Sequence, residues 1–181
     1  MEATEKVLDV GEFRINFASA GNGAPLLLLH GSEPQESWHV WEPVLAIGDT
    51  YRLIAPDFLG YGRSTRPEET PDFRAQAQML RDFVEKLGIQ KLSLMGSGWG
   101  GQVALEFALD WPDSVGSIVL VACSYDKDQL RRLQNFRAPQ VMQLARSFLS
   151  NPEAMVSEPP EMENELKGME LRKKDEKGES L

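Results

Sequence analysis

The stretch from Leu92 to Gly101 constrains the fold of this chain more than any other part of the sequence. An apolar run of strand length, Leu92 to Met95, precedes four glycines within the six residues Gly96 to Gly101. The run suits a buried strand, and the glycines permit the close backbone approach of a sharp turn. Apolar residues then recur at helical spacing as far as Pro112, where a helix ends. We therefore predict a strand, a tight turn centred on Gly98, and a helix.

The rest of the chain alternates between strand-like and helix-like patterns. Lys6 to Ala18 alternates apolar and polar residues around Gly11, which predicts an antiparallel hairpin. Continuous apolar runs predict buried strands at Leu26–Leu29, Tyr51–Asp57 and Ser117–Ala122, and helical spacing predicts helices over Trp38–Leu45 and Pro71–Leu87. Alternation of this kind predicts an α/β fold, with a mostly parallel sheet and flanking helices.

The pattern changes after Ser124, where no further strand-like run follows. A length of 181 residues suffices for one domain of ordinary size. We expect residues 1–124 to form the α/β core of this domain. Residues 125–158 should be helical, with apolar positions on one face between Gln140 and Leu149. Residues 159–181 are dominated by charged side chains and are expected to form a frayed helix or a disordered tail.

Composition excludes several classes of function. With 28 acidic and 19 basic residues the net charge is -9, so neither nucleic acid nor an anionic membrane is an expected partner. Cys123 is the only cysteine, which excludes an internal disulfide, and the two histidines form no cluster with metal-ligand spacing. We expect no metal and no cofactor. Met1 to Val10 resembles neither a signal peptide nor a membrane anchor, so a cytoplasmic location is expected.

Three motifs resemble those of the α/β-hydrolase superfamily, over Glu12 to about Ser124. His30-Gly31-Ser32 is similar to the family's HG-x turn, and Asp57 to Ser64 is similar to its D-x-x-G-x-G-x-S loop. Gly96 to Gly101 is similar to its nucleophile elbow, the strained turn that presents the attacking side chain. The order and separation of the motifs also agree. The resemblance implies a truncated α/β-hydrolase fold with a partial, helical cap segment after the core.

Two branches of the superfamily stay open. Glu36-Ser37-Trp38 with Trp41, and Trp99-Gly100-Gly101, are similar to epoxide hydrolases and haloalkane dehalogenases, whose nucleophile is aspartate. His30-Gly31-Ser32, Arg66-Pro67-Glu68 and Val141 to Val156 are similar to serine-dependent hydrolases that cleave carbon-carbon bonds. By descent, the resemblance implies a hydrolase of esters, epoxides or carbon-carbon bonds.

The chain departs from the family pattern where the chemistry takes place. The nucleophile position is Gly98, which has no side chain to attack with, and Ser97 stands one position early on a tight turn. No histidine follows His39, whereas the family takes its general base from the end of the chain. We expect His30 to orient its turn. Asp126 is either a relic of the triad acid or a solvated loop carboxylate. The sequence therefore predicts an impaired enzyme.

Backbone amides can still bind a ligand when the catalytic side chains are lost. The resemblance implies an oxyanion hole formed by the amides of Ser32 and Trp99, which would bind a small acyl or carbonyl ligand weakly. The alternative function is a non-catalytic interaction or regulatory protein that uses the remnant fold. A dinucleotide site is a rival explanation of Gly96-x-Gly98-x-x-Gly101, but no acidic residue ends the following strand to hold a ribose.

The strand at residues 117–122 is internal in the resembled fold. If its outer edge is unpaired here, it should favour self-association or pairing with a complementing chain.

Overall fold

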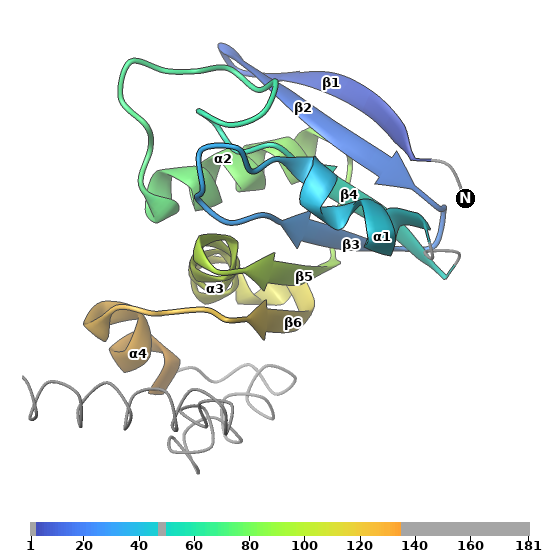
Figure 1. Ribbon diagram of the computed structural model, residues 1–181. Helices are drawn as coiled ribbons and strands as arrows, with labels where there is room; N and C mark the ends of the chain where they lie inside the picture. The colour runs from blue at the N-terminus through green and yellow to red at the C-terminus, as the bar shows by residue number, and fades with distance from the viewer. Residues whose placement is uncertain (1–2, 47–49, 135–181) are drawn as a thin grey trace, which may run out of the picture. The chain divides into compact units, whose positions relative to one another are not determined.

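A six-stranded sheet forms the centre of the computed structural model, which describes residues 3–46 and 50–134 (Figure 1). The strand order across the sheet is β1-β2-β4-β3-β5-β6. The strands are β1 (Thr4–Val10), β2 (Phe13–Ala20), β3 (Ala24–Leu29), β4 (Tyr51–Pro56), β5 (Leu92–Ser97) and β6 (Val115–Val121). The helices are α1 (Glu42–Ala46), α2 (Phe73–Lys86), α3 (Trp99–Asp110) and α4 (Lys127–Gln134), with short 3₁₀ helices at Trp38–Trp41 and Pro112–Ser114.

The sheet is mixed and mostly parallel, as the sequence predicts. β1 and β2 form an antiparallel hairpin, β2 pairs antiparallel with β4, and β3 pairs in parallel with both β4 and β5. β6 pairs in parallel with β5. The register sets Leu29 beside Gly96, so the carboxyl ends of β3 and β5 meet at the same edge of the sheet.

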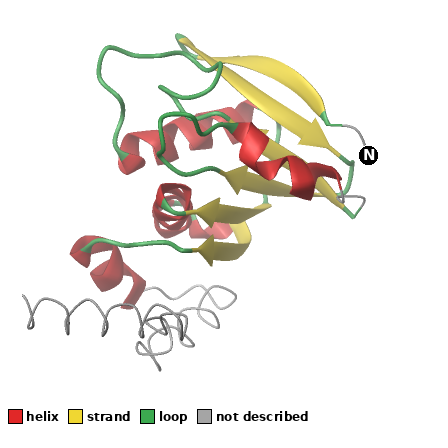
Figure 2. Cartoon of the chain, in the orientation of Figure 1, coloured by secondary structure: helices red, strands yellow, loops and turns green. Residues whose placement is uncertain are grey.

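Two apolar clusters cover the two faces of the sheet. α2 and α3 pack on one face, and the 3₁₀ helix at Trp38–Trp41 and α1 pack on the other (Figure 2). Successive residues of β3 alternate between them, with Leu27 and Leu29 in the first cluster and Leu28 in the second. A strand that is covered on both faces needs apolar side chains at every position, which explains the unbroken leucine run.

Helix α2 lies within the predicted range Pro71–Leu87 and begins two residues later than predicted, at Phe73. The Asp72 side chain accepts hydrogen bonds from the amides of Arg74 and Ala75, at 3.0 and 2.9 Å, and so caps the first turn. Gly88 follows the last turn with φ +71°, a conformation that favours glycine.

Helix α3 is buried more completely than its sequence pattern predicts. The expected apolar face is buried, and Glu106, on another side of the helix, is buried too. Its carboxylate pairs with Arg132 of α4 at 2.5 Å and with Arg74 of α2 at 3.7 Å, while Gln129 of α4 donates to it at 3.1 Å. Charged residues from two other helices therefore cover a side of α3 that periodicity alone would place in solvent.

Helix α4 lies within residues 125–158, for which the sequence predicts a helical segment, and covers only their first part. The predicted amphipathic helix at Gln140–Leu149 and the charged segment 159–181 lie outside the described residues. Among the helices of residues 3–46 and 50–134, none has the length and apolar character needed to cross a membrane.

Candidate active site

The three motifs singled out in the sequence converge at the carboxyl ends of β3, β4 and β5. Aromatic rings join them: His30 lies 4.7 Å from Phe58, Phe58 lies 5.3 Å from Trp99, and Tyr61 lies 6.1 Å from Trp99, measured between ring centroids. His30 follows β3, Phe58 and Tyr61 follow β4, and Trp99 opens α3 after β5. Parallel strands deliver their following loops to one edge of a sheet, which is where α/β proteins place their sites.

Gly98 lies at the apex of the turn between β5 and α3. Its backbone has φ +53° and ψ -119°, and its amide donates to the carbonyl oxygen of Val121 at 2.9 Å. A Cβ atom added at Gly98 would meet no other atom within 4 Å. The turn therefore has the strained geometry of a nucleophile elbow, and a side chain at this position would enter open space.

The glycines on either side of Gly98 have a different role. A Cβ at Gly96 would overlap the backbone of Gly100, and a Cβ at Gly100 would overlap the carbonyl oxygens of Leu29 and His30. The first turn of α3 thus packs directly on the end of β3, and only glycine fits at these two positions. Gly98 is under no such packing constraint.

His30 holds the HG turn together. It is fully buried, its Nδ1 lies 2.8 Å from the carbonyl oxygen of Gly31, and its Nε2 accepts a hydrogen bond from the amide of Phe58 at 3.1 Å. These partners place the ring proton on Nδ1. Burial lowers the pKa of His30, which favours the neutral ring. Both ring nitrogens are engaged, as expected for a histidine that orients its turn.

Asp57 organises the loop that follows β4. Its buried carboxylate accepts hydrogen bonds from Asn16 Nδ2 at 2.8 Å, from the Trp38 amide at 2.7 Å and from the Arg63 amide at 3.0 Å. A Cβ at Gly62 would overlap this carboxylate. The aspartate and glycines of the D-x-x-G-x-G motif therefore form a backbone-binding structure, and this carboxylate has no free oxygen to offer a substrate.

Two residues near the HG turn were missed as site residues by the sequence analysis. Glu36 Oε2 is buried without a hydrogen-bond partner in the described structure, and a Cβ at Gly31 would overlap it. The Tyr61 hydroxyl donates to the carbonyl oxygen of Ser32 at 3.2 Å. Burial, together with the negative charges of Glu36 and Glu33, raises the pKa of Tyr61. The only sequence signal for Glu36 is its place before Ser37-Trp38, which marks a family branch and not a contact.

The remaining candidates lie in separate surroundings. Ser97 is the last residue of β5, half-buried and paired with Val121. Asp126 accepts from the Gln129 amide at 2.7 Å and lies 3.7 Å from Arg74. His39 is exposed, stacks on Trp38 and pairs with Glu42. Among the described residues, no hydrogen bond or ion pair joins Asp126 or His39 to Gly98. The described part of the chain contains no group of three or more potential metal ligands.

A family model described as the alpha/beta hydrolase fold matches residues 24–159. The chain belongs to this family. The match includes the HG turn, the loop after β4 and the elbow, so the converging motifs are the family's own. It also rules out the dinucleotide-binding explanation of the glycines, because the elbow accounts for their spacing.

The relatives of this chain include proteins named as an epoxide hydrolase and as dehalogenases. The chain is 38% identical over 121 residues to a soluble epoxide hydrolase of Corynebacterium sp. (strain C12), covering 66% of this chain and 42% of the relative. It is 38% identical over 122 residues to a fluoroacetate dehalogenase of Burkholderia sp., covering 64% of this chain and 40% of the relative. The solved structure of the epoxide hydrolase CorEH without ligand matches with a TM-score of 0.62 and 37% identity, covering 66% of this chain and 42% of that one. The chain thus spans about two fifths of the length of these relatives.

The elbow geometry predicts different costs for alanine at its glycines. Gly98→Ala should lower the free energy of unfolding by about 1 to 3 kcal/mol, the range for a non-glycine residue held in a sparsely populated conformation. Gly100→Ala should cost more, because its Cβ meets two backbone carbonyls that cannot move aside. Urea denaturation measures both values. Gly116→Ala is the control, since the nearest atom to its Cβ is at 3.6 Å. Equal costs for Gly98→Ala and Gly100→Ala would contradict the packing argument.

Proposed function

We propose that this chain is a catalytically impaired member of the alpha/beta hydrolase family, descended from enzymes of the epoxide hydrolase and dehalogenase type. The observation that carries the proposal is Gly98 at the apex of the elbow. Covalent catalysis on this fold needs a hydroxyl, thiol or carboxylate at that position, and glycine supplies none. Packing does not explain the glycine, because a side chain there would meet open space.

The surroundings of the two histidines support the same proposal. A general base must have a free ring nitrogen within reach of the proton that it removes. His30 uses both ring nitrogens in its own turn, and its pKa is lowered by burial. His39 lies against Glu42 on the surface. Within this chain, therefore, no histidine is placed to activate a nucleophile or a water at Gly98.

We further propose that the elbow binds small neutral carbonyl compounds through backbone donors. Trp99 opens α3, so its amide has no acceptor within the helix, and the Ser32 amide lies in the neighbouring HG turn. The negative charges of Glu36 and Glu33 act on Tyr61, whose hydroxyl contacts the carbonyl oxygen of Ser32. Their negative charge disfavours a carboxylate ligand.

The edge of the sheet supports self-association as a property of this chain. β6 pairs with β5 on one side, and no other described strand pairs with it. It contains no charged residue, and Val119 and Val121 are 47% and 41% exposed. β1, the opposite edge, carries Glu5, Lys6 and Asp9, and charged side chains discourage pairing between edges. We propose that a second copy of the chain pairs with β6.

The proposal predicts that one substitution does not restore catalysis. Gly98→Ser and Gly98→Asp should hydrolyse aryl esters and epoxides no faster than the unmodified chain, because a missing general base alone costs roughly 100- to 10,000-fold in rate. Initial rates and burst amplitudes measure this. Turnover well above the buffer rate in the unmodified chain would contradict the proposal. Ser97→Ala would then show whether Ser97 is the nucleophile.

Ligand binding at the elbow predicts a preference for neutral ligands. Phenylacetamide should shift the NMR signals of the Trp99 indole and the Ser32 amide, with a dissociation constant on the order of 1 mM, as expected for so few atoms. Phenylacetate should bind several-fold more weakly, and Glu36→Gln should reduce the difference because it removes the charge. Glu42→Gln, a matched change at an exposed carboxylate, should not. Unchanged Trp99 signals with both ligands would refute the site.

Edge pairing predicts association that depends on β6. Sedimentation velocity should show dimers or larger species for the unmodified chain, and Val119→Lys should shift them towards monomer, since lysine on an edge strand opposes pairing. Val7→Lys, on the 51% exposed valine of β1, is the matched control and should leave the association unchanged. A monomer at all concentrations, or equal effects of the two lysines, would exclude pairing through β6.

A further inference from the structure

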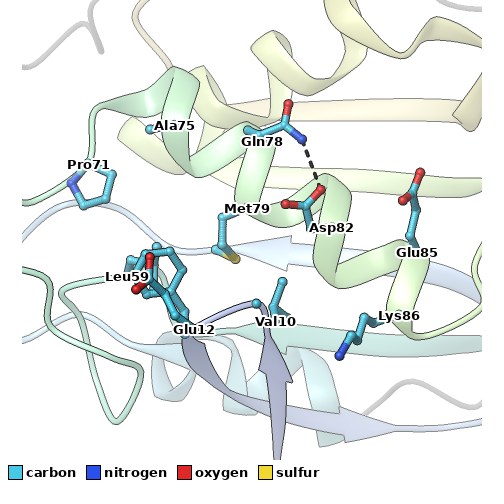
Figure 3. A pocket seen from close by; sticks show the side chains of 12 residues that line it. Val10, Glu12, Leu59, Pro71, Ala75, Gln78, Met79, Asp82, Glu85 and Lys86 are labelled. Carbon is cyan, nitrogen blue, oxygen red and sulfur yellow. Dashed lines mark hydrogen bonds between the residues drawn. The ribbon is translucent and has the colours of Figure 1, made fainter.

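A cavity of about 680 Å³ lies between helix α2 and the turn of the β1–β2 hairpin (Figure 3). One wall is a stripe of α2 that runs from Ala75 to Lys86. The other wall is the hairpin turn around Gly11, with Leu59 and Pro71 closing one end. Leu59 belongs to the loop after β4, but none of the lining residues belongs to the elbow or the HG turn, so the cavity is lined by other residues than those around Gly98.

The floor of the cavity is apolar and consists of side chains that are packed into the core. Val10, Leu59 and Met79 are each almost fully buried, and all three belong to the core cluster beneath α2. Figure 3 shows the Met79 side chain extending from α2 towards Val10. The volume lies within the range of small-molecule sites, about 300 to 1,000 Å³, which characteristically combine apolar walls with a few polar groups. Such a floor suits an aryl or short alkyl group.

The rim of the cavity carries more negative than positive charge. Glu12, Asp82 and Glu85 line it, against a single ammonium group from Lys86. The Glu85 carboxylate is paired with Arg81 at 2.5 Å, outside the cavity lining. Asp82 Oδ1 accepts from Gln78 Nε2 at 3.1 Å, which leaves acceptor capacity on the carboxylate.

Glu12 is the most available of these carboxylates. It lies beside Gly11 at the tip of the hairpin, is exposed, and makes no hydrogen bond or ion pair with any described residue. Figure 3 places it across the cavity from Asp82, on the opposite wall. A positive group entering over the apolar floor would therefore lie between carboxylates supplied by the two walls.

We propose that this cavity binds a small organic cation with an apolar body, of the arylalkylamine class. The apolar part packs on Val10, Leu59 and Met79, and the ammonium group lies between Glu12 and Asp82. An organic anion of the same shape meets an excess of negative charge at the rim. A neutral analogue gains the floor contacts alone, so its affinity lies between the two.

The test compares three probes that share one apolar body: phenylbutylamine, phenylbutanol and phenylbutyrate. Titration of the full chain with ¹³C-methyl methionine labelling follows Met79, assigned through Met79→Leu. The amine should bind with a dissociation constant on the order of 1 mM, the alcohol more weakly and the carboxylate most weakly. Added salt should weaken amine binding and leave alcohol binding nearly unchanged.

Variants separate the roles of charge and floor. Glu12→Gln and Asp82→Asn should each weaken amine binding by about two- to five-fold, and Lys86→Gln should strengthen it by a similar factor. Asp113→Asn is the matched control, because Asp113 is exposed and lies outside the cavity lining. Ala75→Phe, on an exposed position of α2, should fill the cavity and abolish binding of all three probes. Circular dichroism verifies the fold of each variant.

The outcomes are distinct. Amine binding that weakens with Glu12→Gln and Asp82→Asn, and not with Asp113→Asn, supports the proposal. Equal affinity for the three probes, tighter binding of the carboxylate, or no shift of the Met79 methyl signal with any probe would overturn it. None of these results depends on activity or ligand binding at Gly98.

Discussion

The close approach of the first turn of α3 to the end of β3 is the contact on which the site depends. At Gly100 the helix backbone lies against the carbonyl oxygens of Leu29 and His30, and at Gly96 the strand backbone lies against the helix. No side chain separates the two elements. Consequently Gly98 and Trp99 come directly beside the HG turn, and the aromatic contacts of Trp99 with Phe58 and Tyr61 follow from that position.

Two buried carboxylates, Asp57 and Glu106, join further elements around this contact. Asp57 accepts three N–H donors and so connects β2, the segment before α1, and the loop after β4. Glu106 does the same for the helices, because Arg132 and Gln129 of α4 and Arg74 of α2 all meet it. Buried charges are costly unless they are paired, and removing one partner of such a pair typically costs about 3 to 5 kcal/mol. Each carboxylate therefore depends on the correct arrangement of segments far apart in sequence.

In the candidate site, the residues that maintain its shape differ from the position that would carry the nucleophile. Packing requires glycine at Gly96 and Gly100. The side chains of Asp57 and His30 accept hydrogen bonds from backbone amides. These parts of the motifs therefore maintain the shape of the site whether or not it catalyses a reaction. Gly98 is the one glycine of the elbow where an added Cβ would meet no neighbour. A chain can lose its nucleophile there without losing its fold, which is the physical basis for proposing a binding function on an intact frame.

The sequence by itself determined the order and type of the elements, because periodicity and glycine or proline signals are local. The leucine run before His30, the helix between Pro71 and Leu87, and the elbow were all predicted correctly. It also determined that Gly98 lacks a nucleophile. The tertiary structure alone decided the burial of Glu106, the orphaned oxygen of Glu36 and the cavity beside α2. Each of these features depends on contacts between residues of separate elements. A local sequence pattern therefore cannot predict it.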